Sequence, residues 1–221
     1  AIQPAQAFIT DVLVDALHAK YVLVGDDFRF GAQRQGDYAM LDAAGLARGF
    51  DVARMMSYEV HGLRVSSSAV REALADGDMA RAAALLGRPY SISGHVRHGR
   101  KLGRTLGTPT LNLGFGHQRP AAQGVFAVQV HGLGDVPLPG VASLGVRPTV
   151  EDAGRQLLEV FCLQWPEALG RDGGYGRCVK VELLHKFHDE RKYPSMEALR
   201  EGIDQDIADA RAWFGVQQAA R

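Results

Sequence analysis

The sequence has very little cysteine and no excess of charge of either sign. Its 221 residues include only Cys162 and Cys178, which makes a disulfide framework implausible and favours the reducing cytoplasm. Lysine and arginine number 25, as do aspartate and glutamate, so zero net charge gives no overall reason to bind nucleic acid or anionic membranes. No apolar run approaches the ~20 residues that span a bilayer. We therefore expect a cytoplasmic globular protein without nucleic-acid or membrane partners.

Two common nucleotide-binding signatures are also missing. The sequence has no G-x-x-x-x-G-K-[ST] P-loop, and its glycine-rich segment, 94–115, contains no G-x-G-x-x-G. A nucleotide site in this chain must therefore be of another kind.

Segment 94–115, GHVRHGRKLGRTLGTPTLNLGF, is the most informative part of what is present. Glycine lets backbone amides approach an anion closely, and basic side chains supply the opposite charge. The candidate phosphate-loop residues are Gly99, Lys101, Gly103 and Gly107. In an extended chain Thr110 and Asn112 share one face, where their oxygens suit Mg²⁺. The segment is interpreted as a Mg-nucleotide site, although the pattern also allows a basic surface hairpin whose glycines serve turns.

The first part of the chain alternates helix-like and strand-like segments, which is typical of α/β layering. The expected elements are a helix over 7–19, a strand over 21–24, a helix over 37–48, a strand over 51–60, a helix over 69–75 and a helix over 78–86. Ser68 is the expected N-cap of the fifth element, and the Asp76-Gly77 pair is expected to end it. We place a domain boundary near Gly87, giving domains 1–87 and 88–221.

After Gly87 the pattern changes to short strands separated by glycine and proline. The clearest strands are 91–97, 124–130, 157–164 and 178–184, a spacing that predicts an antiparallel barrel or sandwich. A helix is expected over 196–214 with Ser195 as its N-cap. Its apolar stripe, which includes Met196, Ile203 and Ile207, is expected to pack into the core.

Glu159 is the candidate catalytic residue. In the strand 157–164 it shares a face with Leu157 and Phe161. A desolvated carboxylate on an apolar face is costly unless it is partnered, and desolvation strengthens it as a base. The pattern alone leaves open a glutamate at a strand edge, or one paired with an arginine such as Arg147.

These residues together carry a family resemblance. Segment 103–113 resembles the G-R-x-L-G-[FY]-P-T-A-N-[LV] signature of riboflavin kinases, and the region before it resembles the adenylyltransferase half of bacterial bifunctional riboflavin kinase/FAD synthetases. The matching stretches elsewhere are 24–31, 65–71, 124–128, 145–149, 158–160 and 189–193. The resemblance covers nearly the whole chain in order. It implies a partial Rossmann-like nucleotidyltransferase domain followed by an antiparallel β-barrel riboflavin kinase domain with a C-terminal helix.

For the second domain, the resemblance implies transfer of phosphate from ATP to riboflavin, giving FMN. Glu159 matches the general base, while Thr110 and Asn112 match the Mg²⁺ side of the site. The family usually has alanine where this chain has Leu111, a departure that should be tolerated. The flavin segment R-x-E-x-[KR]-F corresponds to 188–193, with His188 in place of the arginine. Its flavin-contact candidates are Glu190, Arg191 and Tyr193, although the pattern alone also fits a solvated turn.

For the first domain, the resemblance implies a site for adenylylation of FMN to FAD. The ATP-side candidates are Ser66, Ser67 and Arg71, and the flavin-side candidates are Phe28 and Phe30. Simple N-capping and core packing are the alternatives for these two groups.

The H-x-G-H motif of the adenylyltransferase family is absent from the sequence, and the chain opens on Ala1. We therefore expect an N-terminally shortened member whose first half is inactive. A non-catalytic flavin- or nucleotide-binding module is the alternative function. The presence together of Thr110, Asn112 and Glu159 favours the enzyme.

Overall fold

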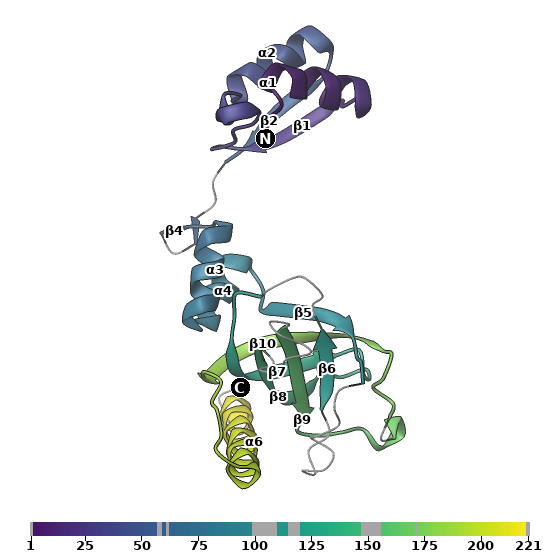
Figure 1. The fold of residues 1–221 in the computed structure, drawn as a ribbon, viewed down its shortest axis with the longest axis vertical. Coiled ribbons are helices and arrows are strands. Elements are labelled where there is room, and N and C mark those ends of the chain that lie inside the picture. The colour runs from purple at the N-terminus through teal and green to yellow at the C-terminus, as the bar shows by residue number, and fades with distance from the viewer. Residues whose placement is uncertain are drawn as a thin grey trace. The chain divides into compact units, whose positions relative to one another are not determined.

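The structure is a computed structural model that describes residues 2–56, 59–60, 62–98, 110–114, 120–146, 156–170 and 172–219. The chain forms two compact units, Ala1–Val65 and Ser66–Arg221, each of which is described by itself (Figure 1). The proposed phosphate-loop residues Gly99, Lys101, Gly103 and Gly107, and also Arg147, lie outside the described residues.

The first unit contains two parallel strands packed with helices (Figure 1). Its elements are α1 (Ala5–Ala7), a π-helical continuation (Phe8–Ala16), β1 (Tyr21–Gly25), α2 (Tyr38–Arg48), β2 (Asp51–Met55), β3 (Glu59–Val60) and β4 (Leu63–Arg64). The α2 helix begins where the Asp37 carboxylate accepts a hydrogen bond from the Met40 amide at 3.0 Å. It ends at Gly49, whose φ of 79° is left-handed, a conformation that favours glycine. The expected α/β alternation is confirmed, but the strand expected over 51–60 ends at Met55.

The second unit is built on a six-stranded antiparallel sheet in the order β5-β10-β7-β8-β9-β6. The strands are β5 (Tyr90–His95), β6 (Leu111–Gly114), β7 (Gly124–His131), β8 (Leu138–Val146), β9 (Gln156–Cys162) and β10 (Cys178–His188). The two ends of this order meet through one bridge, where the Arg97 amide donates to the Asn112 carbonyl at 2.9 Å. The sheet therefore curls into the expected barrel.

Alternate residues of each strand fill the inside of this barrel. In β9, Leu158, Val160 and Cys162 are buried, whereas the residues between them are half-buried or exposed. Strand β7 is buried on both faces because its outer residue Val125 packs beneath α6. That outer contact forms a second apolar layer, and burial of each large side chain in it contributes roughly 1.5–3 kcal/mol.

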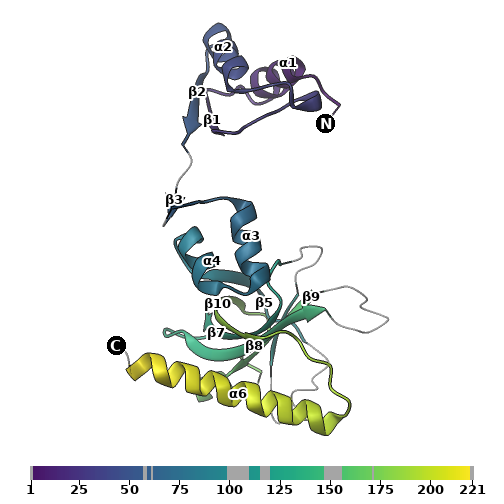
Figure 2. The same cartoon turned by 90° about the vertical axis from the view of Figure 1, so that its left-hand side faces the viewer.

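Among the described residues, the α-helices of the second unit are α3 (Ser67–Asp76), α4 (Met79–Leu86) and α6 (Met196–Ala219). The first two form a hairpin that contacts β5 and β10 through α4, while α6 lies along β7 and β8 (Figure 2). Ser195 caps α6 as expected, accepting from the Ala198 amide at 3.1 Å. The apolar stripe is confirmed at Ile207 but wrong at Met196, whose position at the first turn leaves it 50% exposed. Within the described residues, no helix has the length and apolarity needed to cross a membrane.

Candidate functional site

A row of paired residues crosses the outer face of the barrel sheet. The strand registers pair Asn112 with Glu159, Glu159 with Ser143, Ser143 with Val125, and Val125 with His188. Directly paired residues of antiparallel strands project from the same face. These five residues, here called the outer row, therefore line up across β6, β9, β8, β7 and β10.

Asn112 is a buried polar residue at one end of the outer row. The residue is only 5% exposed, and its side-chain Nδ2 donates a hydrogen bond to the Thr110 carbonyl at 3.3 Å. Its Oδ1 finds no hydrogen-bond partner among the described residues. A buried amide oxygen without a partner is costly unless a ligand meets it, and such an oxygen suits Mg²⁺. Thr110, half-buried, lies immediately before β6.

Glu159 lies next in the outer row and is exposed. It shares its face with Leu157 and Phe161, as expected, but the expected desolvation is wrong. Helix α6 packs over Phe161, Val125 and their neighbours, while Glu159 itself stays exposed. A small molecule can therefore reach this carboxylate.

The segment after β10 brings a second carboxylate onto the outer row. The Ser143 hydroxyl donates to Oε1 of Glu190 at 2.8 Å. Gly145 lies beneath the same carboxylate, and a Cβ atom at this position would overlap Glu190. Glu190 therefore sits over β8, the strand next to the one that carries Glu159.

The other candidates for flavin contact in this segment differ in exposure. Arg191 is exposed, whereas Tyr193 is half-buried with its ring against Gly202 of α6. Burial and the nearby Asp206 carboxylate raise the pKa of Tyr193, and Arg191 acts in the opposite direction. Tyr193 thus connects the segment to α6.

Lys186 secures the start of the same segment. Its Nζ lies 2.6 Å from Oδ1 of Asp189, and this hydrogen bond and ion pair lower the pKa of Asp189. Its aliphatic stem fills the space beside Gly124 of β7 and Gly77 at the end of α3. A side chain at either glycine would displace the lysine.

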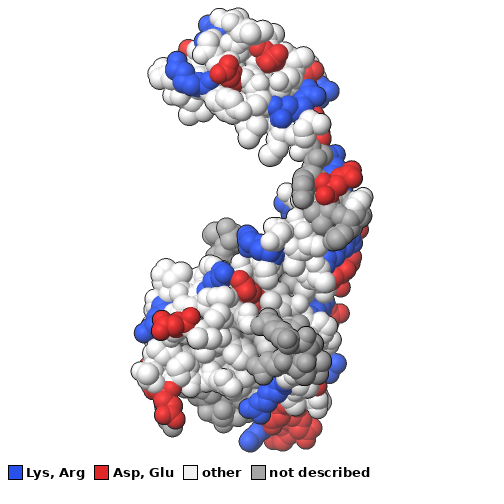
Figure 3. Space-filling model, turned by 180° about the vertical axis from the view of Figure 1, so that it is seen from behind, with Lys and Arg blue, Asp and Glu red and all other residues white. Residues whose placement is uncertain are grey.

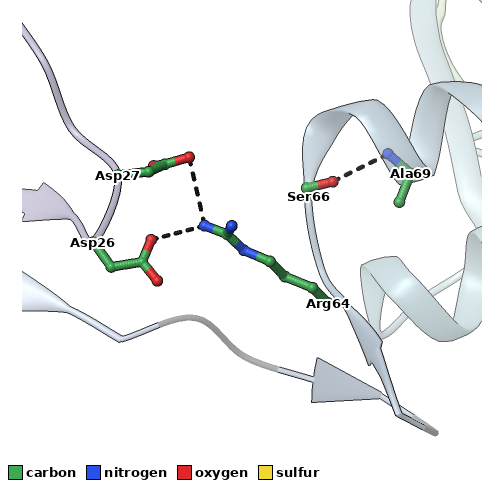
Figure 4. A network of polar contacts seen from close by, with 5 residues as sticks. All are labelled: Asp26, Asp27, Arg64, Ser66 and Ala69. Carbon is green, nitrogen blue, oxygen red and sulfur yellow. Dashed lines mark hydrogen bonds and ion pairs between the residues drawn. The ribbon is translucent and has the colours of Figure 1, made fainter.

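The remaining candidates come from the first part of the chain. Phe30 is buried and Phe28 stacks on it with ring centroids 5.5 Å apart, so both belong to an aromatic cluster. In the same unit Arg64 Nη2 contacts Asp26 at 2.8 Å and Asp27 at 3.5 Å (Figure 4). Lysine, arginine, aspartate and glutamate are intermixed on the face shown in Figure 3.

Ser66 is the N-cap of α3, where its hydroxyl accepts from the Ala69 amide at 3.1 Å (Figure 4). The expected cap at Ser68 is therefore wrong by two residues, because the helix begins at Ser67. Ser67 and Arg71 are exposed on the same helix. The capping interaction alone accounts for the position of Ser66.

Sequence reasoning missed Ser143 and the His188–Asp206 pair. Ser143 lies in a strand that was not anticipated, and His188 contacts a helix residue 18 positions later in the chain. The departure of His188 from the family pattern was the only sequence signal at either place.

The barrel, the outer row and the segment over it define the class to which the second unit belongs. Residues 86–214 match the family model described as riboflavin kinase, and residues 1–69 match the model described as FAD synthetase. The kinase fold class expected from the sequence is thereby confirmed.

Whole-chain relatives make the assignment more specific. Bifunctional riboflavin kinase/FMN adenylyltransferase of Escherichia coli K12 is 47% identical over 98% of this chain and 67% of its own length. The Haemophilus influenzae protein of the same description is 44% identical over 97% of this chain and 68% of its own length. This chain belongs to the bifunctional riboflavin kinase/FMN adenylyltransferase family and spans about two thirds of these relatives.

A solved structure supports the same fold. The structure described as a macrolide-efflux protein from Streptococcus pneumoniae has a TM-score of 0.69 and 28% identity to this chain. The similarity covers 96% of this chain and 66% of that one. 

Proposed function

We propose that this chain transfers the γ-phosphate of ATP to riboflavin in a Mg²⁺-dependent reaction, forming FMN and ADP. The observation that carries the proposal is the pairing of Asn112 and Glu159 in the outer row. One supplies a buried oxygen with no partner among the described residues, and the other an exposed carboxylate. The match to the riboflavin kinase family supports riboflavin and ATP as the substrates.

Glu159 is the proposed general base. It takes the proton from the terminal ribityl hydroxyl of riboflavin, and the hydroxyl oxygen attacks the γ-phosphorus in line. The P–O bond to the β-phosphate breaks, and ADP leaves with that oxygen. An exposed position suits this role because the hydroxyl must come within hydrogen-bond reach of the carboxylate.

Thr110 and Asn112 are the proposed residues on the metal side. The unpartnered Oδ1 of Asn112 fits a hard cation, and Thr110 precedes it at the edge of the same strand. Mg²⁺, when bound, supplies positive charge beside the phosphate oxygens. The family pattern assigns the phosphates of ATP to Gly99, Lys101, Gly103 and Gly107.

Glu190, Arg191 and Tyr193 are the proposed flavin contacts. Support comes from the position of Glu190 over β8, beside the strand that carries the proposed base. Tyr193 and Arg191 extend this surface toward α6. A flavin bound here would place its ribityl chain toward Glu159.

We further propose that the boundary between the functional halves lies at Gly87 and that the protein acts in the cytoplasm. In the first half, Ser66, Ser67, Arg71, Phe28 and Phe30 retain the family pattern for FMN adenylylation, but the H-x-G-H motif is absent. This chain should therefore form no FAD from FMN and ATP. Chromatographic detection of FAD formed in proportion to enzyme would contradict this proposal.

The decisive experiment measures FMN and ADP production from riboflavin and Mg-ATP by three proteins. The wild type should be active. Glu167→Gln is the control, because Glu167 is an exposed glutamate outside the outer row, and it should also be active. Glu159→Gln should lose nearly all turnover yet still bind riboflavin. Full activity in Glu159→Gln would remove Glu159 as the base. Riboflavin binding without FMN from the wild type would instead favour a non-catalytic binding module.

A further inference from the structure

Both ring nitrogens of His188 face oxygen atoms. Nδ1 lies 2.7 Å from the backbone carbonyl oxygen of Asp189, and Nε2 lies 2.7 Å from Oδ1 of Asp206. A carbonyl oxygen and a carboxylate oxygen only accept hydrogen bonds, so each nitrogen must donate. Only the doubly protonated imidazolium carries a hydrogen on both nitrogens, so the two contacts are hydrogen bonds together only when the ring is charged.

This histidine joins three parts of the kinase unit. It is the last residue of β10, it bonds to the first residue of segment 189–193, and it bonds to α6. Its side chain is 16% exposed and that of Asp206 is 15% exposed, so solvent screens this ion pair less than a surface pair.

The charged neighbours come from each of these elements. Asp206 faces the ring from α6, Asp189 and Tyr193 belong to the segment, and Lys186 precedes it on β10. The paired β7 residue, Val125, carries no charge. The Asp189 carboxylate forms an ion pair with Lys186, so the main carboxylate partner of His188 is Asp206.

We propose that His188, as an imidazolium, is the positioning residue that holds segment 189–193 over the outer row, so that affinity for riboflavin weakens as pH rises. The inference rests on the proposed flavin role of Glu190. Glu190 lies two residues beyond His188, and its carboxylate reaches the outer row through the hydrogen bond from Ser143. The Asp189 carbonyl held by His188 fixes the backbone from which Glu190 extends.

The sign of the pH effect follows from the hydrogen bonds. The segment is held through both contacts only by the charged ring, because a neutral ring can donate to only one of its two partners. Affinity for riboflavin should therefore fall once the ring has lost its proton at higher pH.

The test measures riboflavin binding without turnover, by quenching of flavin fluorescence, at about pH 6 and about pH 8.5. The wild type should bind roughly three- to tenfold more weakly at the higher pH, the effect expected from losing one ordinary hydrogen bond. His188→Arg should bind equally at both values, because a guanidinium stays charged throughout. Asp206→Asn should bind weakly, whereas Asp204→Asn, at an exposed position of the same helix, should behave like the wild type.

Equal pH slopes in the wild type and His188→Arg would overturn the inference while leaving the kinase intact. No riboflavin binding by any variant at either pH would overturn the proposed function and this inference together. A second measurement needs no variant: ¹⁵N chemical shifts of the histidine rings in the wild type. Two protonated nitrogens at His188 at the lower pH support the inference, and a neutral ring there contradicts it.

Discussion

Asn112 and Glu159 are cross-strand partners on β6 and β9, yet one is buried and the other exposed. In an antiparallel pair their side chains project from the same face of the sheet. A buried acceptor and an exposed carboxylate thus stand side by side without an intervening residue. This is an arrangement in which one residue can hold a cation while its neighbour meets a substrate hydroxyl.

Replacing Asn112 with leucine should separate stability from activity. The change removes a buried oxygen that has no partner among the described residues, at the cost of one long hydrogen bond to Thr110. The free energy of unfolding should stay the same or rise by up to about 1 kcal/mol. The kinase rate should fall at least about tenfold with a raised Mg²⁺ requirement, because a ligand oxygen is lost. Urea unfolding and a Mg²⁺ titration of the rate check both parts; a marked loss of stability would show that the amide is structural.

Gly145→Ala should weaken riboflavin binding with little effect on ATP. The added Cβ atom would occupy the space of the Glu190 carboxylate and force it away from Ser143. We expect the KM for riboflavin to rise about tenfold, as for loss of one charge-assisted hydrogen bond. Gly134→Ala is the matched control, since nothing lies within 4 Å of its new methyl group. Unchanged KM values in Gly145→Ala would mean that Glu190 does not contact flavin.

Ser66→Ala and Ser68→Ala should differ in stability. Ser66 supplies the hydroxyl that caps α3, so its loss should cost about 1 kcal/mol of unfolding free energy. Ser68 lies inside the helix and exposed, and its replacement should change stability by less than about 0.5 kcal/mol. Denaturant unfolding followed by circular dichroism distinguishes the two. The reverse order would place the helix start at the position expected from the sequence.

The two thiols should react at very different rates. Cys162 is buried in the barrel, and burial raises the pKa of its thiol to about 12, whereas Cys178 is exposed. At pH 8 only about one Cys162 in ten thousand is a thiolate, the reactive form. A disulfide reagent should therefore titrate one thiol in the native protein and two after denaturation. Native Cys178→Ser should react with none; rapid reaction of this variant would contradict burial of Cys162.

The sequence predicted the elements that have strong local signals. The structure confirms Ser195 as a cap, and it confirms that α3 ends at Gly77 and α4 at Gly87. The sequence analysis did not predict strand β8, because its proline and glycines look like turn residues. They are tolerated because the sheet supplies partners on both sides from β7 and β9.

Candidate residues for the site can be proposed from the sequence, but their arrangement in space cannot. The alternation of apolar and polar residues predicts that Glu159 shares a face with Leu157 and Phe161. It does not predict which residues of that face a helix distant in the sequence covers. Helix α6 decides this, and its contacts span the sequence from Val125 to Ala210. The pairing of Ser143 with Glu190 is equally non-local, 47 residues apart.

The place of Asp206 in the chain bears on when the site can form during synthesis. Asp206 follows every member of the outer row in sequence, and it holds His188 from a helix that also covers β7 and β8. A nascent chain that has emerged from the ribosome only as far as β10 already contains Asn112, Glu159 and Ser143. It still lacks Asp206, the carboxylate that contacts His188. If segment 189–193 binds flavin as proposed, translation must reach α6 before that segment is anchored.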